Sequence, residues 1–405
     1  MGKVGNLRRL SRVAILVAIA ATLVGVPLAG SANPDVSGFE LDGNAAGNGA
    51  TDWDALGSPL DFTGFIVDPT DDADRGYTTG GSKDTLDVSS WKWKDGDVSP
   101  DKDNIANAYA AVYAEQNSLI LYFGQNRVLD KNGDANVGFW FLQDSVGLNS
   151  DGSFSGTHKD GDILVQSEFT NGGSVSGVHI FKWQGGSLTL VSNQAQCTGS
   201  KLGTADACAI VNTGTISTSW AGSITAPYFF EGGLNLSGLF PQAVPCFSTF
   251  LTNTRTSQSE SAQLKDFALG GIDTCGSIEI TKVAQPGDST EFDYSTTVAL
   301  NPSTFKLTNG ATRAYDKLGA GQYSVTEAAQ TGSWAFDSLT CPTASGPGTS
   351  VQISGQTANI TLGFLGDVKC TYVNKRKPQV KVVKVTDPTN DAGKFNLQIN
   401  GTTHA

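Results

Sequence analysis

Alternating apolar and polar residues run through most of the chain, and they predict strands rather than helices. Short runs of aromatic and β-branched residues are bounded by Gly, Asn and Asp, and the clearest of them are 137–144, 162–169, 178–183 and 187–192. Such runs are typical of β-strands. The segment 104–117 fits a helical face as well as a strand, and we favour a strand because the apolar run 118–124 follows directly. The pattern predicts an all-β protein.

An internal repeat begins after Cys275, where the expected strands become short and regular. The stretch 276–295 is echoed by 378–397. The corresponding pairs are Lys282 with Lys384 and Phe292 with Phe395. An offset of about one hundred residues is the signature of a tandem array. Because the second copy contains only its first two expected strands, it cannot bury a core alone, and we expect the protein to continue beyond it.

The amino terminus has the pattern of a secretory signal peptide. Four basic residues precede a long apolar run, and the small residues 30–32 offer a cleavage site. Gly25 and Pro27 interrupt the run and disfavour an uncleaved membrane anchor. We therefore expect a secreted mature chain that begins near Asn33.

Together these patterns predict a signal peptide followed by three β-rich segments. The expected ranges are 1–32 for the signal peptide, 35–275 for a β-sandwich head domain, 276–377 for a second domain and 378–405 for a truncated further repeat. A cell-wall sorting signal would belong to a missing carboxyl-terminal region. We thus expect an extracellular protein that is attached to the cell wall through that region.

Composition removes several classes of partner and gives no sign of an enzyme. The chain has 27 Lys and Arg against 39 Asp and Glu, with a formal net charge of −12, which disfavours nucleic acid and anionic membranes as partners. It has only three His residues and none of the common metalloprotease, nucleophile-elbow or phosphate-loop motifs. An extracellular hydrolase with two carboxylates stays an alternative, because such a site has no fixed spacing.

Six cysteines in an exported chain favour disulfides, and no C-x-x-C pair points to a metal site. Fifteen pairings are possible. Sequence proximity and the domain boundaries favour three of them: Cys197 with Cys208, Cys246 with Cys275, and Cys341 with Cys370.

Three strands of the second domain each turn one polar residue towards their apolar face. Alternation places Lys282 with Ile278 and Ile280, and it places Glu327 and Asn374 in the same way on later strands. A buried ammonium or carboxylate needs a partner or a shifted pKa. A neutral lysine amine, a protonated glutamic acid and an asparagine amide can form a Lys–Asn isopeptide bond with release of ammonia. Solvated side chains near strand ends would be the ordinary alternative.

The residues around Glu327 carry a resemblance to a known family. The stretch "YSVTEAA" at 323–329 resembles the Y-x-L-x-E box of prealbumin-like, SpaA/CnaB-type domains of Gram-positive pilins and surface adhesins, with Val325 in place of Leu. Those domains have a lysine on the first strand and an Asn or Asp on the last, where Lys282 and Asn374 stand here. The resemblance implies a prealbumin-like, immunoglobulin-like sandwich at 276–377 and a non-enzymatic stalk role.

The head loosely resembles family 9 carbohydrate-binding modules and DOMON-like sandwiches. The stretches that carry this resemblance lie at 41–56, 117–141 and 228–240. It implies a large, jelly-roll-like β-sandwich, and it makes an extracellular carbohydrate-binding protein the main alternative function. The expected partner is a cell-wall, host or environmental glycan or protein.

Two groups of head residues are candidates for ligand binding. Asp130, Asn132 and Asp134 offer oxygen ligands at alternate positions and suit calcium, although a turn between strands explains the same residues. Trp91 and Trp93 are the better candidates among the tryptophans for an exposed aromatic strip that stacks on sugars, whereas core packing is the commoner fate of such side chains.

Overall fold

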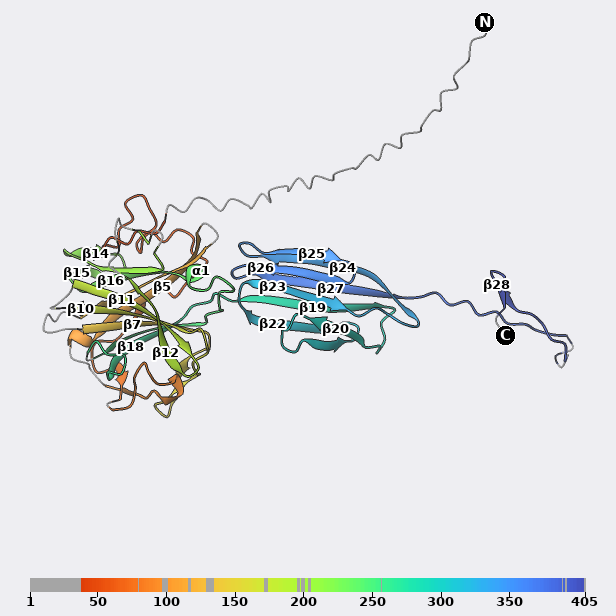
Figure 1. Cartoon of the computed structure of the whole chain (residues 1–405), viewed down its shortest axis with the longest axis horizontal. Helices are drawn as coiled ribbons and strands as arrows, with labels where there is room; N and C mark the ends of the chain where they lie inside the picture. The colour runs from red at the N-terminus through yellow and green to blue at the C-terminus, as the bar shows by residue number, and fades with distance from the viewer. Residues whose placement is uncertain are drawn as a thin grey trace, which may run out of the picture. The chain divides into compact units, whose positions relative to one another are not determined.

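The computed structural model describes residues 38–403, except 79, 97–100, 116–117, 129–134, 171–173, 195–196, 198–200, 203–204, 256, 388 and 390–391. The predicted signal peptide at 1–32 lies outside the described residues. Strands dominate both sides of Cys275, and the helices of the described ranges are short: the 3₁₀ helices η1 (Val88–Ser90) and η2 (Asp101–Asp103) and the helix α1 (Leu236–Leu239). None of them is long and apolar enough to cross a bilayer. The prediction of an all-β protein is confirmed (Figure 1).

The head is a sandwich of two large antiparallel sheets. One sheet has the order β1-β5-β6-β16-β13, with β2 also paired to β5, and its strands are β1 (Asp61–Phe62), β2 (Ile66–Val67), β5 (Ile105–Glu115), β6 (Ser118–Arg127), β13 (Ala207–Val211) and β16 (Phe229–Asn235). The ambiguous segment 104–117 contains the strand β5 over 105–115, as favoured from its sequence context. It pairs with β6 in an antiparallel hairpin.

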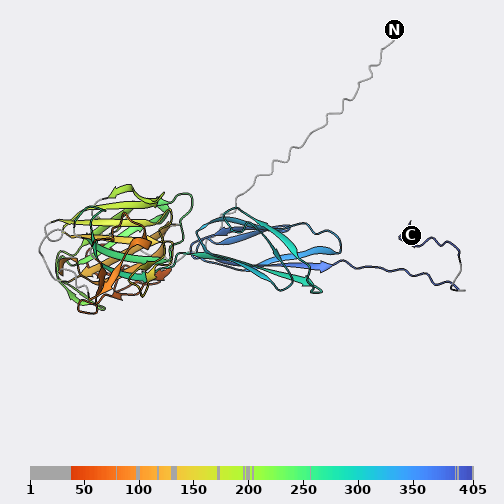
Figure 2. The same ribbon diagram turned by 90° about the horizontal axis from the view of Figure 1, so that it is seen from below.

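The second head sheet has eight strands in the order β12-β11-β10-β7-β17-β18-β3-β4. Its strands are β3 (Arg75–Tyr77), β4 (Trp93–Asp95), β7 (Ala135–Leu142), β10 (Ile163–Thr170), β11 (Ser174–Gln184), β12 (Ser187–Gln194), β17 (Thr249–Arg255) and β18 (Leu264–Gly271). Two small hairpins complete the head: β8 (Gly147–Leu148) with β9 (Phe154–Ser155), and β14 (Ile216–Thr218) with β15 (Gly222–Ile224). The packed sheets are visible from two directions in Figures 1 and 2.

The strand β7, in the middle of the eight-stranded sheet, is buried on both faces, which explains its continuous aromatic run. Phe139 and Phe141 pack into the core between the two sheets. Trp140 faces the other way, into a second apolar cluster with Trp91, Trp183 and neighbouring aromatic residues. A strand with an apolar residue at every position is typical of a sheet covered on both faces. Loops of the head therefore supply an outer layer over this sheet.

Residues 276–376 form a second sandwich of two sheets. One has the order β22-β19-β27-β24, and the other β21-β20-β23-β26-β25. The strands are β19 (Gly276–Gln285), β20 (Phe292–Thr296), β21 (Thr304–Leu307), β22 (Thr312–Leu318), β23 (Gly321–Glu327), β24 (Trp334–Ser345), β25 (Ser350–Ser354), β26 (Thr357–Leu362) and β27 (Asp367–Arg376). The first and last strands, β19 and β27, pair in parallel. In the described part of the chain, no sheet combines strands from both sides of Cys275.

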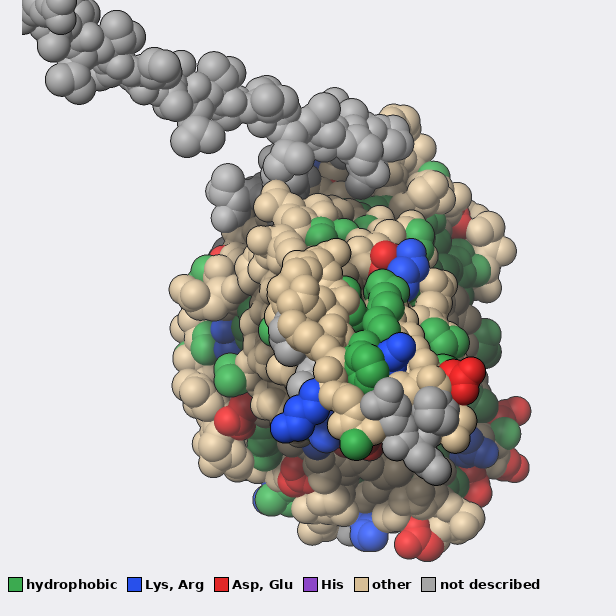
Figure 3. Space-filling model, turned by 90° about the vertical axis from the view of Figure 1, so that its right-hand side faces the viewer, with side chains coloured by type: hydrophobic (Ala, Val, Ile, Leu, Met, Phe, Trp, Pro, Cys, Tyr) green, Lys and Arg blue, Asp and Glu red, His purple; other side chains and the backbone are tan. Residues whose placement is uncertain are grey.

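The segment after β27 is extended and carries only the short hairpin of β28 (Gln398–Ile399) with β29 (Thr402–Thr403). Five of its large apolar side chains are exposed: Val380, Val382, Val383, Val385 and Phe395. Figure 3 shows a narrow band of hydrophobic side chains next to basic ones on the face that it displays. Exposed apolar residues at strand-like spacing agree with the view that this piece alone buries no core.

Candidate functional site

The candidate site lies inside the second sandwich, and its side chains come from both sheets. Lys282 projects from β19 and Asn374 from the neighbouring β27, where Lys282 is paired with Tyr372 and Asn374 with Ala284. Glu327 ends β23 in the facing sheet. Lys282 and Asn374 are fully buried, and Glu327 is 1% exposed. All three point inward, as the alternation of each strand predicts.

Lys282 and Glu327 form a buried ion pair. The Lys282 Nζ lies 2.8 Å from the Glu327 Oε1 and 3.5 Å from the backbone oxygen of Tyr372, to which it also donates. The same nitrogen lies 4.2 Å from the centre of the Phe292 ring. A buried ammonium without these contacts would be very costly, so the pair and the ring together hold the amine in place.

The protein environment drives both members of this pair towards their neutral forms. Burial raises the pKa of Glu327, and the opposing pull of Lys282, Tyr294 and Asn374 does not cancel that rise. Burial likewise lowers the pKa of Lys282 against the attraction of Glu327. Because the two shifts are opposite in sign, transfer of one proton from Lys282 to Glu327 becomes easier than in water. A neutral amine is the nucleophilic form of lysine.

Asn374 has an amide group that no hydrogen bond restrains. Neither its Oδ1 nor its Nδ2 has a hydrogen-bond partner among the described residues, and the same holds for the Glu327 Oε2. The amide is near enough to Glu327 to lower the pKa of that carboxyl, yet it lacks the geometry of a hydrogen bond. Buried polar groups are nearly always satisfied, so three unsatisfied atoms beside one another require an explanation.

Aromatic side chains that the sequence reading did not assign to the site close it on several sides. The Tyr294 hydroxyl donates to the Glu327 Oε1 at 3.3 Å, and the Tyr372 hydroxyl donates to the Val325 oxygen at 2.7 Å. Tyr294 and Tyr372 pack edge to face with ring centres 5.2 Å apart. Phe292 is covered in turn by Trp334. This wall excludes water, which strengthens the electrostatic contacts inside it.

Three disulfides are present, and they join the pairs favoured by sequence proximity: Cys197–Cys208, Cys246–Cys275 and Cys341–Cys370. No cysteine of the described residues is free. The Cys341–Cys370 bond links β24 to β27, the strand that carries Asn374. The second sandwich therefore already has one covalent link. Within the sheet, β27 lies between β24, to which the disulfide joins it, and β19, which carries Lys282.

The prediction that Trp91 belongs to an exposed aromatic strip on the head is wrong. This side chain is fully buried, and its indole nitrogen donates to the Lys83 oxygen at 2.9 Å. Trp93 is half-buried and packs against Arg75. Alternation put the two side chains on one face but could not show that loops cover that face. The other candidate group, Asp130, Asn132 and Asp134, lies outside the described residues.

The contact between lysine and phenylalanine recurs in the repeat. Lys384 Nζ lies 4.6 Å from the centre of the Phe395 ring, and these are the two residues that correspond to Lys282 and Phe292. The residues therefore match both in sequence and in contact. The assignment of 378–405 to a further repeat stays a prediction.

Comparison with protein-family models identifies the second sandwich. Residues 278–376 match the model described as a prealbumin-like fold domain, of the SpaA type. The chain therefore contains a SpaA-type prealbumin-like domain that includes Lys282, Glu327 and Asn374. No curated protein matches the chain.

Among solved structures, the chain is similar to several Gram-positive surface proteins. A bacterial adhesin from Mobiluncus mulieris, described as containing intramolecular disulfide, isopeptide and ester bond cross-links, is 10% identical over 64% of this chain and 91% of that one, with a TM-score of 0.27. The group B streptococcus pilus 2b backbone protein is 11% identical over 74% and 97%, with a TM-score of 0.24.

Proposed function

We propose that this protein is a secreted, cell-surface structural protein of the adhesin type, in which the prealbumin-like domain is a stalk module locked by an isopeptide bond between Lys282 and Asn374. The observation that carries the proposal is the buried group of Lys282, Glu327 and an Asn374 amide without hydrogen-bond partners. The domain performs this reaction once and then serves as a spacer. It turns over no substrate.

The reaction balances with the atoms already in the site. Lys282 gives a proton to Glu327, and the neutral Nζ attacks the Cγ of Asn374. Glu327 in its acid form donates a hydrogen bond to the Asn374 oxygen and then carries a proton to the departing nitrogen. One C–N bond forms, one C–N bond breaks, and ammonia leaves. No oxidant, metal or cofactor is required.

The position of the bond explains why it would matter to a stalk. Lys282 and Asn374 lie on the first and last strands of the sandwich, which are adjacent and parallel. A pulling force that enters before β19 and leaves after β27 would pass through the bond, so residues 283–373 would carry no load. When a protein attached to the cell surface is stretched, the bond would therefore keep this domain folded.

Single-molecule stretching of the full chain under reducing conditions tests the proposal. Complete extension of the loop from 282 to 374 would add roughly 300 Å, at about 3.3–3.6 Å per residue. We expect no step of this length in the native protein, and we expect it to appear in Glu327→Gln, which keeps the side-chain shape but removes the acid. Lys375→Ala, an exposed neighbour of Asn374 on the same strand, should behave as the native protein. A full-length step in the native protein would refute the proposal.

The head would be the part that this stalk presents. Its partner is expected to be a cell-wall, host or environmental glycan or protein, and the protein is expected to lie outside the cell. Trp91 is buried, so of the two candidate tryptophans only Trp93 could stack on a sugar. The buried group of Lys282, Glu327 and Asn374 is the reason for which we propose the structural role.

A further inference from the structure

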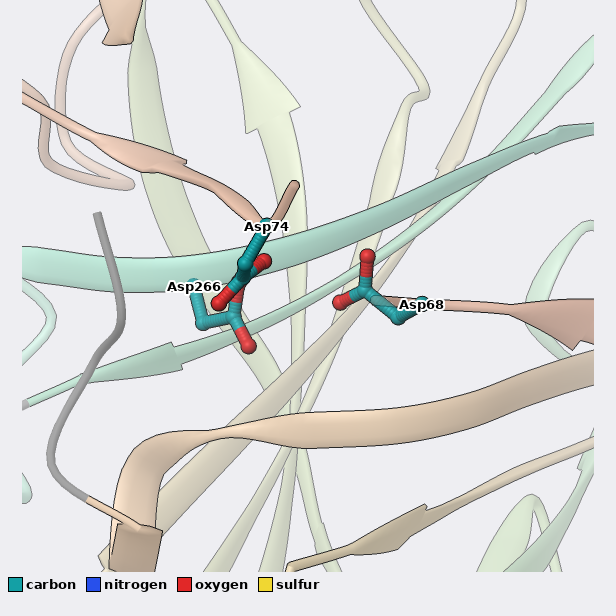
Figure 4. A group of neighbouring side chains, drawn as sticks. All are labelled: Asp68, Asp74 and Asp266. Atoms are coloured by element: carbon teal, nitrogen blue, oxygen red, sulfur yellow. The ribbon is translucent and has the colours of Figure 1, made fainter. Parts of the chain in front are cut away.

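Three aspartates from separate parts of the head meet beside the edge of the eight-stranded sheet. Asp68 follows β2, Asp74 precedes β3, and Asp266 lies within β18. One carboxylate oxygen from each lies within 4.8 Å of the other two. Asp68 is 9% exposed, and the other two are fully buried. Figure 4 shows the Asp68 carboxylate turned towards Asp74 and Asp266.

The Asp68 side chain is the observation that points to a ligand. Its Oδ2 is buried and has no hydrogen-bond partner among the described residues. The carboxylates of Asp74 and Asp266 lie beside it, so a charge on Asp68 meets like charges at close range. A carboxylate that is more than nine-tenths buried and faces two others, without a donor of its own, lacks the compensation that buried charges normally have.

Asp266 is held in a fixed orientation within this group. Its Oδ2 accepts the Ile105 N–H at 2.7 Å, and its Oδ1 accepts the Phe267 N–H at 2.8 Å. A carboxylate has about four lone-pair sites, so each oxygen keeps capacity for a further partner. The backbone thus positions Asp266 without neutralising the group.

We propose that Asp68, Asp74 and Asp266 form a calcium site that ties the segment between β2 and β3 to the strand β18. Calcium binds carboxylate oxygens at about 2.3–2.6 Å, so two ligands on one ion can lie up to roughly 4.6–5.2 Å apart, which accommodates the spacing here. Magnesium demands shorter distances and stricter geometry, and zinc prefers nitrogen and sulfur ligands. The site is independent of the isopeptide chemistry and differs from the candidate at 130–134.

The ion would replace a costly arrangement with a stabilising one. Three neighbouring carboxylates repel one another, and a divalent cation removes most of that repulsion while it satisfies the Asp68 oxygen. The segment 68–74 contains no regular strand, and the residue pair that joins β3 to β18, Gly76 with Asp266, lies just beyond its end. Calcium would therefore fix the position of this segment on the head.

Calcium titration of the full chain, freed of metal with a chelator and followed by calorimetry, tests the site. We expect saturable binding and a higher melting temperature of the head in the native protein. Asp68→Asn should weaken binding at least about tenfold, because even outer-shell partners of a metal are worth about 10- to 100-fold. Asp72→Asn removes a charge from an exposed position of the same segment and should bind as the native protein does.

Three results would overturn the site. The first is a native protein that shows no binding heat up to about 1 mM calcium, the weak end of extracellular calcium modules, and this result does not depend on the folding of any variant. The second is calcium binding by Asp68→Asn that is as tight as in the native protein, which would place the ion elsewhere in the head. Selective binding of magnesium in place of calcium would also contradict the proposal.

Discussion

Asn374→Ala separates the proposed cross-link from the ion pair beside it. The substitution leaves Lys282 and Glu327 intact, with their 2.8 Å contact, and removes only the carbonyl that the amine would attack. In the chain-entropy estimate, closing the loop from 282 to 374 stabilises the fold by about 4–5 kcal/mol. We expect the free energy of unfolding of this domain to fall by about that amount.

The sign of the change in the free energy of unfolding distinguishes a cross-linked Asn374 from an unlinked one. Without a cross-link, Asn374 is a buried amide with neither of its polar atoms hydrogen-bonded, and such a group costs about 1–3 kcal/mol. Its removal would then be neutral or stabilising. The Cys341–Cys370 disulfide changes the estimate little, because loop entropy grows only with the logarithm of loop length.

Hydrogen exchange read by mass spectrometry can measure this change within the full chain. Amides of β23 and β26 lie in the sheet opposite Asn374, and their slowest exchange reports the free energy of opening of this sandwich alone. Measurement under reducing conditions removes the disulfide from the comparison. Lys375→Ala, at an exposed neighbouring position, serves as the control. Equal or slower exchange in Asn374→Ala would refute the reasoning.

Other substitutions test the rest of the structure. Replacing Cys341 and Cys370 by Ser should destabilise the second sandwich by about 3–4 kcal/mol in a Glu327→Gln background, as measured by denaturant unfolding. Trp91→Ala should cost the head about 3–5 kcal/mol because it empties a core position, whereas Trp93→Ala should cost much less; equal melting temperatures would contradict this.

A further substitution tests how the stability of the head depends on pH. Burial, followed by nearby carboxylates, raises the pKa of Asp52 to about 8, so the folded head holds a proton that the unfolded chain releases. The free energy of unfolding of the head should therefore fall as the pH rises from about 4 to about 8, and Asp52→Asn should flatten that fall. Urea unfolding across this range measures both slopes, and equal slopes would count against a protonated Asp52.

Alternation along single strands predicted the inward direction of Lys282, Glu327 and Asn374, because a strand has only two faces and the apolar neighbours mark the inner one. It could not supply the contact between Tyr294 and Glu327, which depends on how two strands of the same sheet align. In the structure these residues are paired across β20 and β23. The sequence contains no local signal for that register.

The head shows where such reasoning fails. Trp91 follows the 3₁₀ helix η1 and lies in the buried aromatic cluster, whereas Trp93 begins the strand β4 and packs at the border of that cluster. Asp266 lies almost two hundred residues beyond Asp68 and Asp74, and β3 pairs with β18, the strand that carries Asp266. Long-range pairing of strands, rather than local pattern, creates this group.

The intact mass of the purified, reduced chain tests the central claim most directly. The account predicts a mass lower than the sequence mass by one ammonia, with the loss mapped to a branched peptide that joins Lys282 to Asn374. The deficit should disappear in Glu327→Gln and persist in Lys375→Ala. A native chain with the full sequence mass, or a deficit that persists in Glu327→Gln, would contradict the account.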